Sequence, residues 1–297
     1  MDKIHGMKSK IETVADLAMK VGRPYLAEYG ATRSRHDFTQ RQLMACLVLR
    51  AYLKTTYRGF VDILTGHAGL REVLGMRDKV PHYTTLQKFS ARSQVLEIAD
   101  RIIAHIGRAA LRLVKRSHPR PAVAMDATGL ETTIASAHFM SRAGRERRKW
   151  LKVSLTVVCG ALFPLGLVVD WGPNNDKCQA AELLAKSEMA AGSLRPARLY
   201  ADAGYDADWI HTWCREQWGV ESLIRPVQHR ADGTLGGTYR AAMTPEHLQR
   251  CQYGQRWHIE SFISGLKRMT GAALTARKAA NQVKEAAIRV LAYTLHR

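Results

Sequence analysis

The sequence changes character at Pro119 and Pro121, and this change limits the folds that the chain can adopt. Before the prolines, apolar residues recur with the period of an α-helix, most clearly between residues 95 and 114. After them come short β-rich runs that are bounded by turn-forming or charged residues. Proline ends a helix because it has no backbone N–H to donate. We therefore expect an all-α N-terminal domain over residues 1–118 and a second, strand-containing domain over residues 119–297.

The order of elements after the prolines indicates one class of α/β fold. Three strands come first, and a helix, a strand, a helix, a strand and further helices follow. The expected strands cover residues 122–130, 151–159, 163–170, 197–203 and 221–227, and the expected helices cover residues 177–191, 206–217, 245–271 and 278–295. This is the order of a ribonuclease H-like domain, so we expect a mixed five-stranded sheet with flanking helices.

Two helix starts in the N-terminal part follow the capping-box pattern, in which glutamine stands three residues after threonine. They begin at Thr39 and Thr84. The second helix would carry Lys88 and Arg92 behind a short helix and a turn, as in a helix-turn-helix reader of DNA. An ordinary helical bundle with basic surface residues explains the pattern equally well, and both interpretations stay open.

The charge balance indicates a polyanionic partner. The 297 residues include 45 Lys plus Arg against 26 Asp plus Glu, a net charge of +19. Nucleic acid is the main expectation, although attachment to ribosomes or to a membrane surface also fits such a charge. The hydrophobic content of 46% excludes a disordered basic tail.

Cysteine usage and the N-terminus bear on the compartment. The five cysteines are scattered without a C-x-x-C pair, which is typical of reduced thiols. The N-terminus has no apolar export signal, and no apolar run reaches the roughly 20 residues that a bilayer requires. We expect a cytoplasmic protein that is associated with the nucleoid when bound to DNA.

Near the C-terminus, four polar residues would share one helix face. At about 100° per residue, Tyr253, Arg256, Glu260 and Lys267 fall on a strip roughly 60° wide. Apolar residues on another side could seat this helix on a core. A solvated face with ion pairs four residues apart is the alternative. Trp257 neighbours the strip; we expect it to pack in the core, with stacking on a flipped base as the alternative.

Two aspartates are expected at the ends of strands that would lie next to each other in the sheet. Asp126 ends the first strand of the second domain, and Asp202 ends the fourth. These strands are neighbours in a ribonuclease H-like sheet, so both acids could converge with Glu260. Mg²⁺ prefers such carboxylate oxygens. The alternative role for either aspartate is to form a turn or a cap. The same logic assigns Asp206 to a helix N-cap, Asp170 to a strand end and Asp176 to a helix start.

The spacing Y-x2-R-x3-E-x6-K resembles the signature of insertion-sequence DDE transposases. The segments around Asp126 and Asp202 resemble other blocks of this family, in the family's order. The resemblance implies that Asp126, Asp202 and Glu260 are catalytic and bind metal, namely two Mg²⁺ ions with Mn²⁺ as a substitute. It also implies that Arg256 and Lys267 contact DNA phosphate and that Tyr253 lies near the DNA.

Further basic residues are expected to contact DNA beside the metal site. They are Arg145, Arg147, Arg148, Lys149 and Lys152. A solvated loop is the alternative for the first four. The resemblance implies a transposase that binds terminal inverted repeats of double-stranded DNA, cleaves the DNA and joins it to target DNA, as a homodimer in the DNA complex. A regulator without catalysis and a related metal-dependent nuclease without strand transfer are the competing hypotheses.

Overall fold

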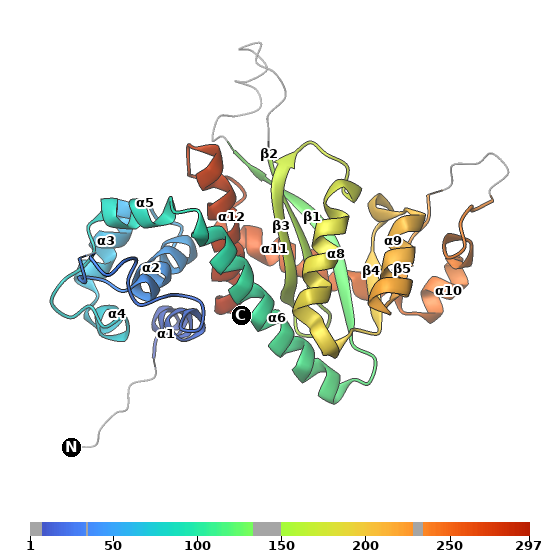
Figure 1. Cartoon of the computed structure of the whole chain (residues 1–297), viewed down its shortest axis with the longest axis horizontal. Helices are drawn as coiled ribbons and strands as arrows, with labels where there is room; N and C mark the ends of the chain where they lie inside the picture. Colours follow the sequence, from blue (N-terminus) through green and yellow to red (C-terminus); the bar gives the residue numbers. More distant parts are fainter. Residues whose placement is uncertain (1–7, 34, 133–149, 228–233) are drawn as a thin grey trace, which may run out of the picture. The chain divides into compact units, whose positions relative to one another are not determined.

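The computed structural model describes residues 8–33, 35–132, 150–227 and 234–297 (Figure 1). The chain divides into two compact units. The first comprises Met1–Ile102, Arg268–Gly271 and Ala276–Arg297, and the second comprises Ile103–Lys267 and Ala272–Thr275. The C-terminal residues thus belong to the first unit. The expected division of function at residue 118 stays a prediction.

The first unit is helical. It contains α1 (Lys10–Gly22), α2 (Gln40–Tyr52), α3 (Tyr57–Gly66), α4 (Ala68–Val73), α5 (Tyr83–Ser90), the start of α6 (Gln94–Ser117) and α12 (Ala279–His296). Helix α12 packs against α1 and α2. Most residues of α2 and α12 are buried, so these two helices carry much of the core of this unit. The expectation of an all-helical N-terminal region is confirmed.

One of the two expected helix starts is confirmed and the other is wrong. Thr39 caps α2, and its hydroxyl accepts from the N–H of Gln42 while the Gln42 side chain accepts from the N–H of Thr39. Helix α5 begins earlier than expected, with His82 at its N-cap position. Thr84 therefore lies inside the helix, and its hydroxyl is 2.8 Å from Nδ1 of His82.

Polar side chains of α12 hold the segment that precedes it. Arg289 forms a buried ion pair with Glu285 at 2.7 Å and donates to the carbonyl oxygen of Gly271 at 3.0 Å. The other carboxylate oxygen of Glu285 accepts from the N–H of Ala276 at 2.7 Å. These bonds satisfy charged groups that would be costly to bury alone.

The second unit is built on one mixed sheet. Its strands are β1 (Ala122–Glu131), β2 (Trp150–Val158), β3 (Phe163–Gly172), β4 (Arg198–Ala201) and β5 (Glu221–Ile224), in the order β3-β2-β1-β4-β5 (Figure 1). Strands β1, β2 and β3 pair antiparallel, whereas β4 pairs parallel with both β1 and β5. The expected ribonuclease H-like fold class is confirmed.

Helices α8 (Lys177–Ala191) and α9 (Asp208–Thr212) belong to this unit, as do α10 (Pro245–Arg250) and α11 (Trp257–Thr270) up to Lys267. Met125 and Ala201 on the sheet share one hydrophobic core with Leu183 of α8 and Ile210 of α9. The part of α6 in this unit approaches β3 closely at Gly107, where a Cβ atom would lie 2.2 Å from the carbonyl oxygen of Pro164. No helix in the described part of the chain is long and apolar enough to span a membrane.

Candidate active site

Asp126 and Asp202 lie where the pairing between β1 and β4 stops. Asp202 directly follows β4 as expected, but β1 continues to Glu131, so the expectation that Asp126 ends its strand is wrong. The parallel pairing of β1 with β4 places Met125 opposite Ala201, and each aspartate is the next residue in the chain. Side chains alternate between the two faces of a strand. Because Met125 and Ala201 point into the core with α8, the two aspartates point toward the opposite face. The expectation that the first and fourth strands are neighbours is confirmed.

The backbone around each aspartate holds one of its carboxylate oxygens. Oδ1 of Asp126 accepts from the N–H of Ala127 at 2.8 Å. Oδ1 of Asp202 accepts from the N–H of Gly204 at 2.9 Å, in the short 3₁₀ turn that follows β4. The second oxygen of each group is left for other partners, which suits side chains that hold a cation.

The single long helix expected over residues 245–271 is wrong. Helix α10 begins as expected, with Thr244 as its N-cap and Pro245 at its first position, but it ends at Arg250, with Cys251 as its C-cap. Gln252 then adopts a left-handed backbone with φ of 59°, and Tyr253–Arg256 forms a 3₁₀ turn before α11 begins. The four residues of the predicted strip therefore come from a turn and a helix.

The turn nevertheless brings its residues to Asp126 and to the end of β4. The hydroxyl of Tyr253 donates to the carbonyl oxygen of Ala201 at 2.8 Å, directly before Asp202. The tyrosine thereby ties the turn to the end of β4. Its predicted contact with DNA stays a prediction.

Arg256 links two of the three predicted catalytic acids. Its Nη1 lies 3.5 Å from Oδ2 of Asp126, and its Nη2 forms an ion pair with Oε1 of Glu260. Asp126 is on β1 and Glu260 is on α11, so the Arg256 guanidinium holds carboxylates from two elements close to each other. The apolar stripe of α11 is buried as expected at Ile259 and Phe262, which orients Glu260 outward.

The carboxylate oxygens of Asp126, Asp202 and Glu260 are not close enough together to bind one ion without rearrangement. Among the described residues, these three are not a group whose ligand atoms all lie within 4.8 Å of one another. Arg256 instead lies between Asp126 and Glu260. The side chain of Glu260 is 51% exposed and can change rotamer. Carboxylates with free oxygens suit a hard divalent ion, which would take over the charge that Arg256 now balances.

Burial is the main cause that raises the pKa of Asp126 to about 6, from an ordinary value of 3.8. The negative charges of Asp202 and Asp176 act in the same direction, whereas the N–H of Ala127 and the Arg256 guanidinium act against them. Such mutual repulsion between carboxylates is what a bound cation relieves. The residues present therefore fit a divalent metal ion.

Asp176 is a fourth acid in this neighbourhood, and its environment differs from the expected role as a simple helix start. It precedes α8 but makes no capping hydrogen bond with its side chain. A Cβ atom on Gly204 would lie 2.8 Å from Oδ2 of Asp176 and 2.9 Å from Oδ1 of Asp202, so both carboxylates border the same glycine. Sequence reasoning missed this because no motif joins the two aspartates.

Lys152 does not reach the surface. Its side chain is 1% exposed, pairs with Oδ1 of Asp176 and donates to the carbonyl oxygen of Asn174 at 2.8 Å. This burial argues against the predicted contact of Lys152 with DNA phosphate. Asp170, which faces Lys152 across the β2–β3 ladder, lies within β3 and is not its final residue.

Asp206 does not cap a helix. Helix α9 begins at Asp208 with Ala207 at its N-cap position. The carboxylate of Asp206 is instead buried, accepts two hydrogen bonds from Arg240 at 2.6 and 2.7 Å, and accepts from the N–H of Val227 at 2.8 Å. Burial alone would raise the pKa of Asp206, but these bonds lower it overall.

The remaining predicted residues have separate outcomes. Trp257 is 54% exposed and stacks on His258 with 4.0 Å between ring centroids, so the expectation that it packs in the core is wrong. Lys267 lies on α11, and its contact with DNA stays a prediction. Four predicted DNA-binding residues lie outside the described residues, namely Arg145, Arg147, Arg148 and Lys149.

Comparison with known proteins identifies the family of this chain. Residues 117–295 match the family model described as the transposase DDE domain. The chain belongs to this family. The match begins at the end of α6 and includes the whole sheet and the three predicted catalytic acids. A search of curated proteins gave no match. The DDE domain makes the chain a transposase in general terms, and proteins of this family act on DNA with divalent metal ions.

Proposed function

We propose that this transposase binds the terminal inverted repeats of its own mobile element, cleaves the DNA there and joins the freed 3′ ends to target DNA. The observation that carries the proposal is the convergence of Asp126, Asp202 and Glu260. Asp126 and Asp202 directly follow the last paired residues of the neighbouring strands β1 and β4, and Arg256 links Asp126 to Glu260. A site for phosphodiester chemistry needs carboxylates that are held on separate rigid elements.

The three carboxylates are proposed to hold two Mg²⁺ ions, with Mn²⁺ able to replace them. When bound, these ions supply activation of the attacking water or 3′-hydroxyl and stabilisation of the leaving oxygen. The chain itself orients the ligands, because backbone N–H groups fix one oxygen of Asp126 and one of Asp202. The half-exposed Glu260 is proposed to complete the site by moving away from Arg256.

Arg256 is proposed to change partners when DNA and metal are bound. In the structure its guanidinium neutralises Asp126 and Glu260. Metal charge on those carboxylates would free the guanidinium for a phosphate oxygen, for which its planar donors are suited. We also propose phosphate contacts by Lys267 and by the basic segment Arg145–Lys149, with Tyr253 close to the DNA.

The net charge of +19 supports a duplex DNA substrate, because phosphate neutralisation provides most of the non-specific affinity for DNA. The two ends of a mobile element must be cut in one complex, so we propose a homodimer on DNA. The catalytic site itself lies within one chain.

The test is a cleavage and joining assay on linear DNA that carries the repeats flanking the gene. With Mg²⁺ or Mn²⁺, we expect nicks at the repeat ends and products joined to a second DNA. Chelator and the Asp202→Ala variant serve as controls, and both should give neither product. Repeat binding without nicking by the wild type would favour the regulator hypothesis. Nicking without joined products would favour a nuclease.

A further inference from the structure

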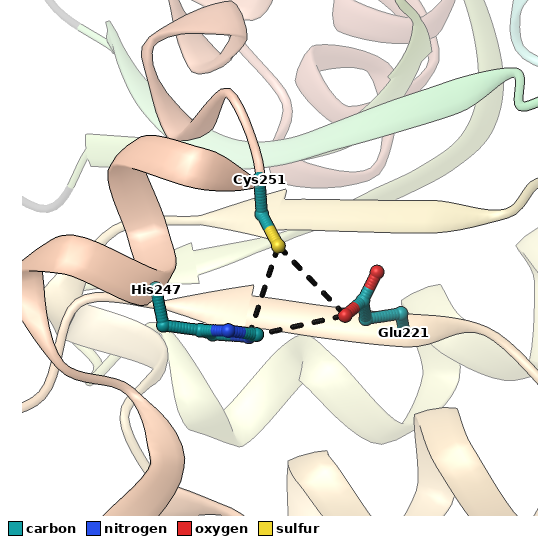
Figure 2. A group of neighbouring side chains, drawn as sticks. All are labelled: Glu221, His247 and Cys251. Carbon is teal, nitrogen blue, oxygen red and sulfur yellow. Dashed lines mark hydrogen bonds and ion pairs between the residues drawn. The ribbon is translucent and has the colours of Figure 1, made fainter.

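Three side chains with different metal-binding groups meet at the start of β5. Oε1 of Glu221 lies 3.8 Å from Nε2 of His247 and 3.9 Å from Sγ of Cys251, and the last two atoms are 3.8 Å apart (Figure 2). Glu221 pairs with Arg198 across β4 and β5 at the beginning of both strands. The group therefore lies at the opposite end of these strands from Asp202.

The local structure aims the three groups at one point. His247 and Cys251 are four residues apart, on α10 and at its C-terminal cap, so their side chains lie one above the other on the same face. Glu221 approaches from the first position of β5. Figure 2 shows the imidazole, the thiol and the carboxylate turned toward one another.

The spacing of these atoms is close to that around a tetrahedral zinc ion. Zinc bonds of about 2.3 Å to sulfur and about 2.0–2.2 Å to nitrogen and oxygen place ligand atoms roughly 3.4–3.6 Å apart. The observed separations of 3.8–3.9 Å need an inward movement of only a few tenths of an ångström. The combination of thiolate, imidazole and carboxylate favours zinc, whereas Mg²⁺ prefers oxygen ligands alone.

Neighbouring residues already hold the ligands in place. Nε of Arg198 binds Oε2 of Glu221 at 3.0 Å, which leaves Oε1 to face the other two groups. Arg198 and Tyr200 both donate to the carbonyl oxygen of Cys251, at 3.1 and 3.0 Å. Metal sites depend on such outer contacts for the orientation of their ligands. Arg120 lies 3.6 Å from Oε2 of Glu221, so two guanidinium groups are close to the site. Because these positive charges oppose the binding of a cation, both the carboxylate and the thiolate must be ionised to hold the metal.

One contact opposes metal binding. Nη2 of Arg250 lies 3.1 Å from Nδ1 of His247. An imidazole that binds metal through Nε2 carries its proton on Nδ1, which then cannot accept from Arg250. Arg250 is exposed and can turn into solvent. Metal binding therefore requires the Arg250 side chain to move away from His247, and the substitution Arg250→Ala would remove the free-energy cost of that movement.

We propose that Glu221, His247 and Cys251 form a structural zinc site, with water as the fourth ligand, that fastens α10 to β5. Cys251 is followed directly by Gln252 and the turn Tyr253–Arg256. The site thus fixes the segment that places Tyr253 against Ala201 and Arg256 against Asp126. It is independent of the divalent ions proposed at Asp126, Asp202 and Glu260.

The test uses the full-length chain carrying Asp202→Ala, so that the catalytic acids contribute less metal binding. After removal of metal with a chelator, Zn²⁺ is titrated against a chromophoric competitor and Co²⁺ is used as a spectroscopic probe. We expect one tight Zn²⁺ per chain and a thiolate-to-cobalt charge-transfer band in the near ultraviolet. Cys251→Ser and His247→Gln should each weaken zinc binding by more than about tenfold and reduce or abolish the band.

Two matched variants sharpen the result. Cys178→Ser removes an exposed thiol elsewhere and should leave zinc affinity and the cobalt band unchanged. Arg250→Ala should raise zinc affinity several-fold. Zinc should also raise the temperature of the unfolding midpoint of the parent chain but not that of Glu221→Gln. Because glutamine keeps the shape of the glutamate side chain, this variant tests the site even if Cys251→Ser folds poorly. Unchanged zinc affinity in Cys251→Ser and Glu221→Gln, or a cobalt spectrum without a thiolate band, would overturn the proposal.

Discussion

Lys152 is almost completely buried, and its ammonium group is paired with the carboxylate of Asp176, which borders the same glycine as Asp202. Removing one partner of such a pair leaves an uncompensated buried charge. We expect Asp176→Asn to lower the free energy of unfolding by about 3 kcal/mol. Urea denaturation of the metal-free protein measures this. The double variant Lys152→Met, Asp176→Asn should recover most of the loss, and a neutral effect of Asp176→Asn alone would show that Lys152 has another counterion.

The raised pKa of Asp126 predicts a pH-dependent stability in the metal-free protein. Its folded pKa of about 6 lies above the ordinary value of 3.8, so this group favours folding below about pH 4 and loses that contribution as the pH rises through 6. Asp126→Asn should therefore stabilise the metal-free chain at pH 7, by up to about 3 kcal/mol, with little change at pH 4. Thermal unfolding at both pH values measures the difference. Equal effects at both pH values would contradict it.

Alanine at Asp126, Asp202 or Glu260 should reduce cleavage to background and leave binding to repeat DNA largely intact. The chemistry requires the metal ions, whereas affinity comes mainly from lysine and arginine. Gel-shift and nicking assays on the same DNA separate the two properties. Glu246, an exposed acid on α10, provides a control, because Glu246→Ala should leave cleavage unchanged. Cleavage like that of the wild type would remove the residue in question from the site.

The basic segment before β2 is expected to contact DNA. Changing Arg145, Arg147 and Arg148 together to alanine should weaken binding and flatten its salt dependence by roughly 0.9 log units for each lost phosphate contact. Affinities measured between low and moderate salt give the slope. An unchanged slope would mean that these side chains are only solvated.

The N-terminal helices are expected to read the terminal repeat, but they need α12 to fold. A fragment of residues 1–118 lacks α12, which packs against α1 and α2 and is buried along most of its length. We expect this fragment to unfold at a low temperature and a peptide of residues 276–297 to stabilise it. Circular dichroism follows the unfolding, and binding to repeat and random DNA at fixed salt then tests the reading head. Equal affinity for both DNAs would count against it.

The strands and their order along the chain were predictable from local patterns, because β-rich runs bounded by turn residues need no tertiary information. That Asp126 and Asp202 are neighbours followed from the expected sheet order, which places β1 beside β4. The continuation of β1 beyond Asp126 to Glu131 did not follow from the local pattern. Helix α8 was predicted at its observed bounds, Lys177–Ala191.

Other features depended on contacts that sequence spacing does not contain. The break at Gln252 follows from a left-handed backbone in a segment with helical periodicity on both sides. The partners of the buried Lys152 and Asp206 are Asp176 and Arg240, which come from distant parts of the chain. Local rules therefore assigned Lys152 to the surface and Asp206 to a cap. Trp257 has a large apolar side chain, so hydrophobicity alone predicts that it is buried, whereas it is exposed in the structure.

The placement of α12 has a consequence for the inheritance of this gene. Helix α12 follows the catalytic sheet in the chain yet packs in the unit that holds α1 and α2. A recombination event that replaced only the codons for residues before 102 would separate those helices from the partner they fit. Exchange of this unit between related mobile elements thus requires that the codons for its N-terminal and C-terminal parts be exchanged together, although the codons for the sheet lie between them. We expect substitutions on the facing surfaces of α2 and α12 to accumulate in pairs.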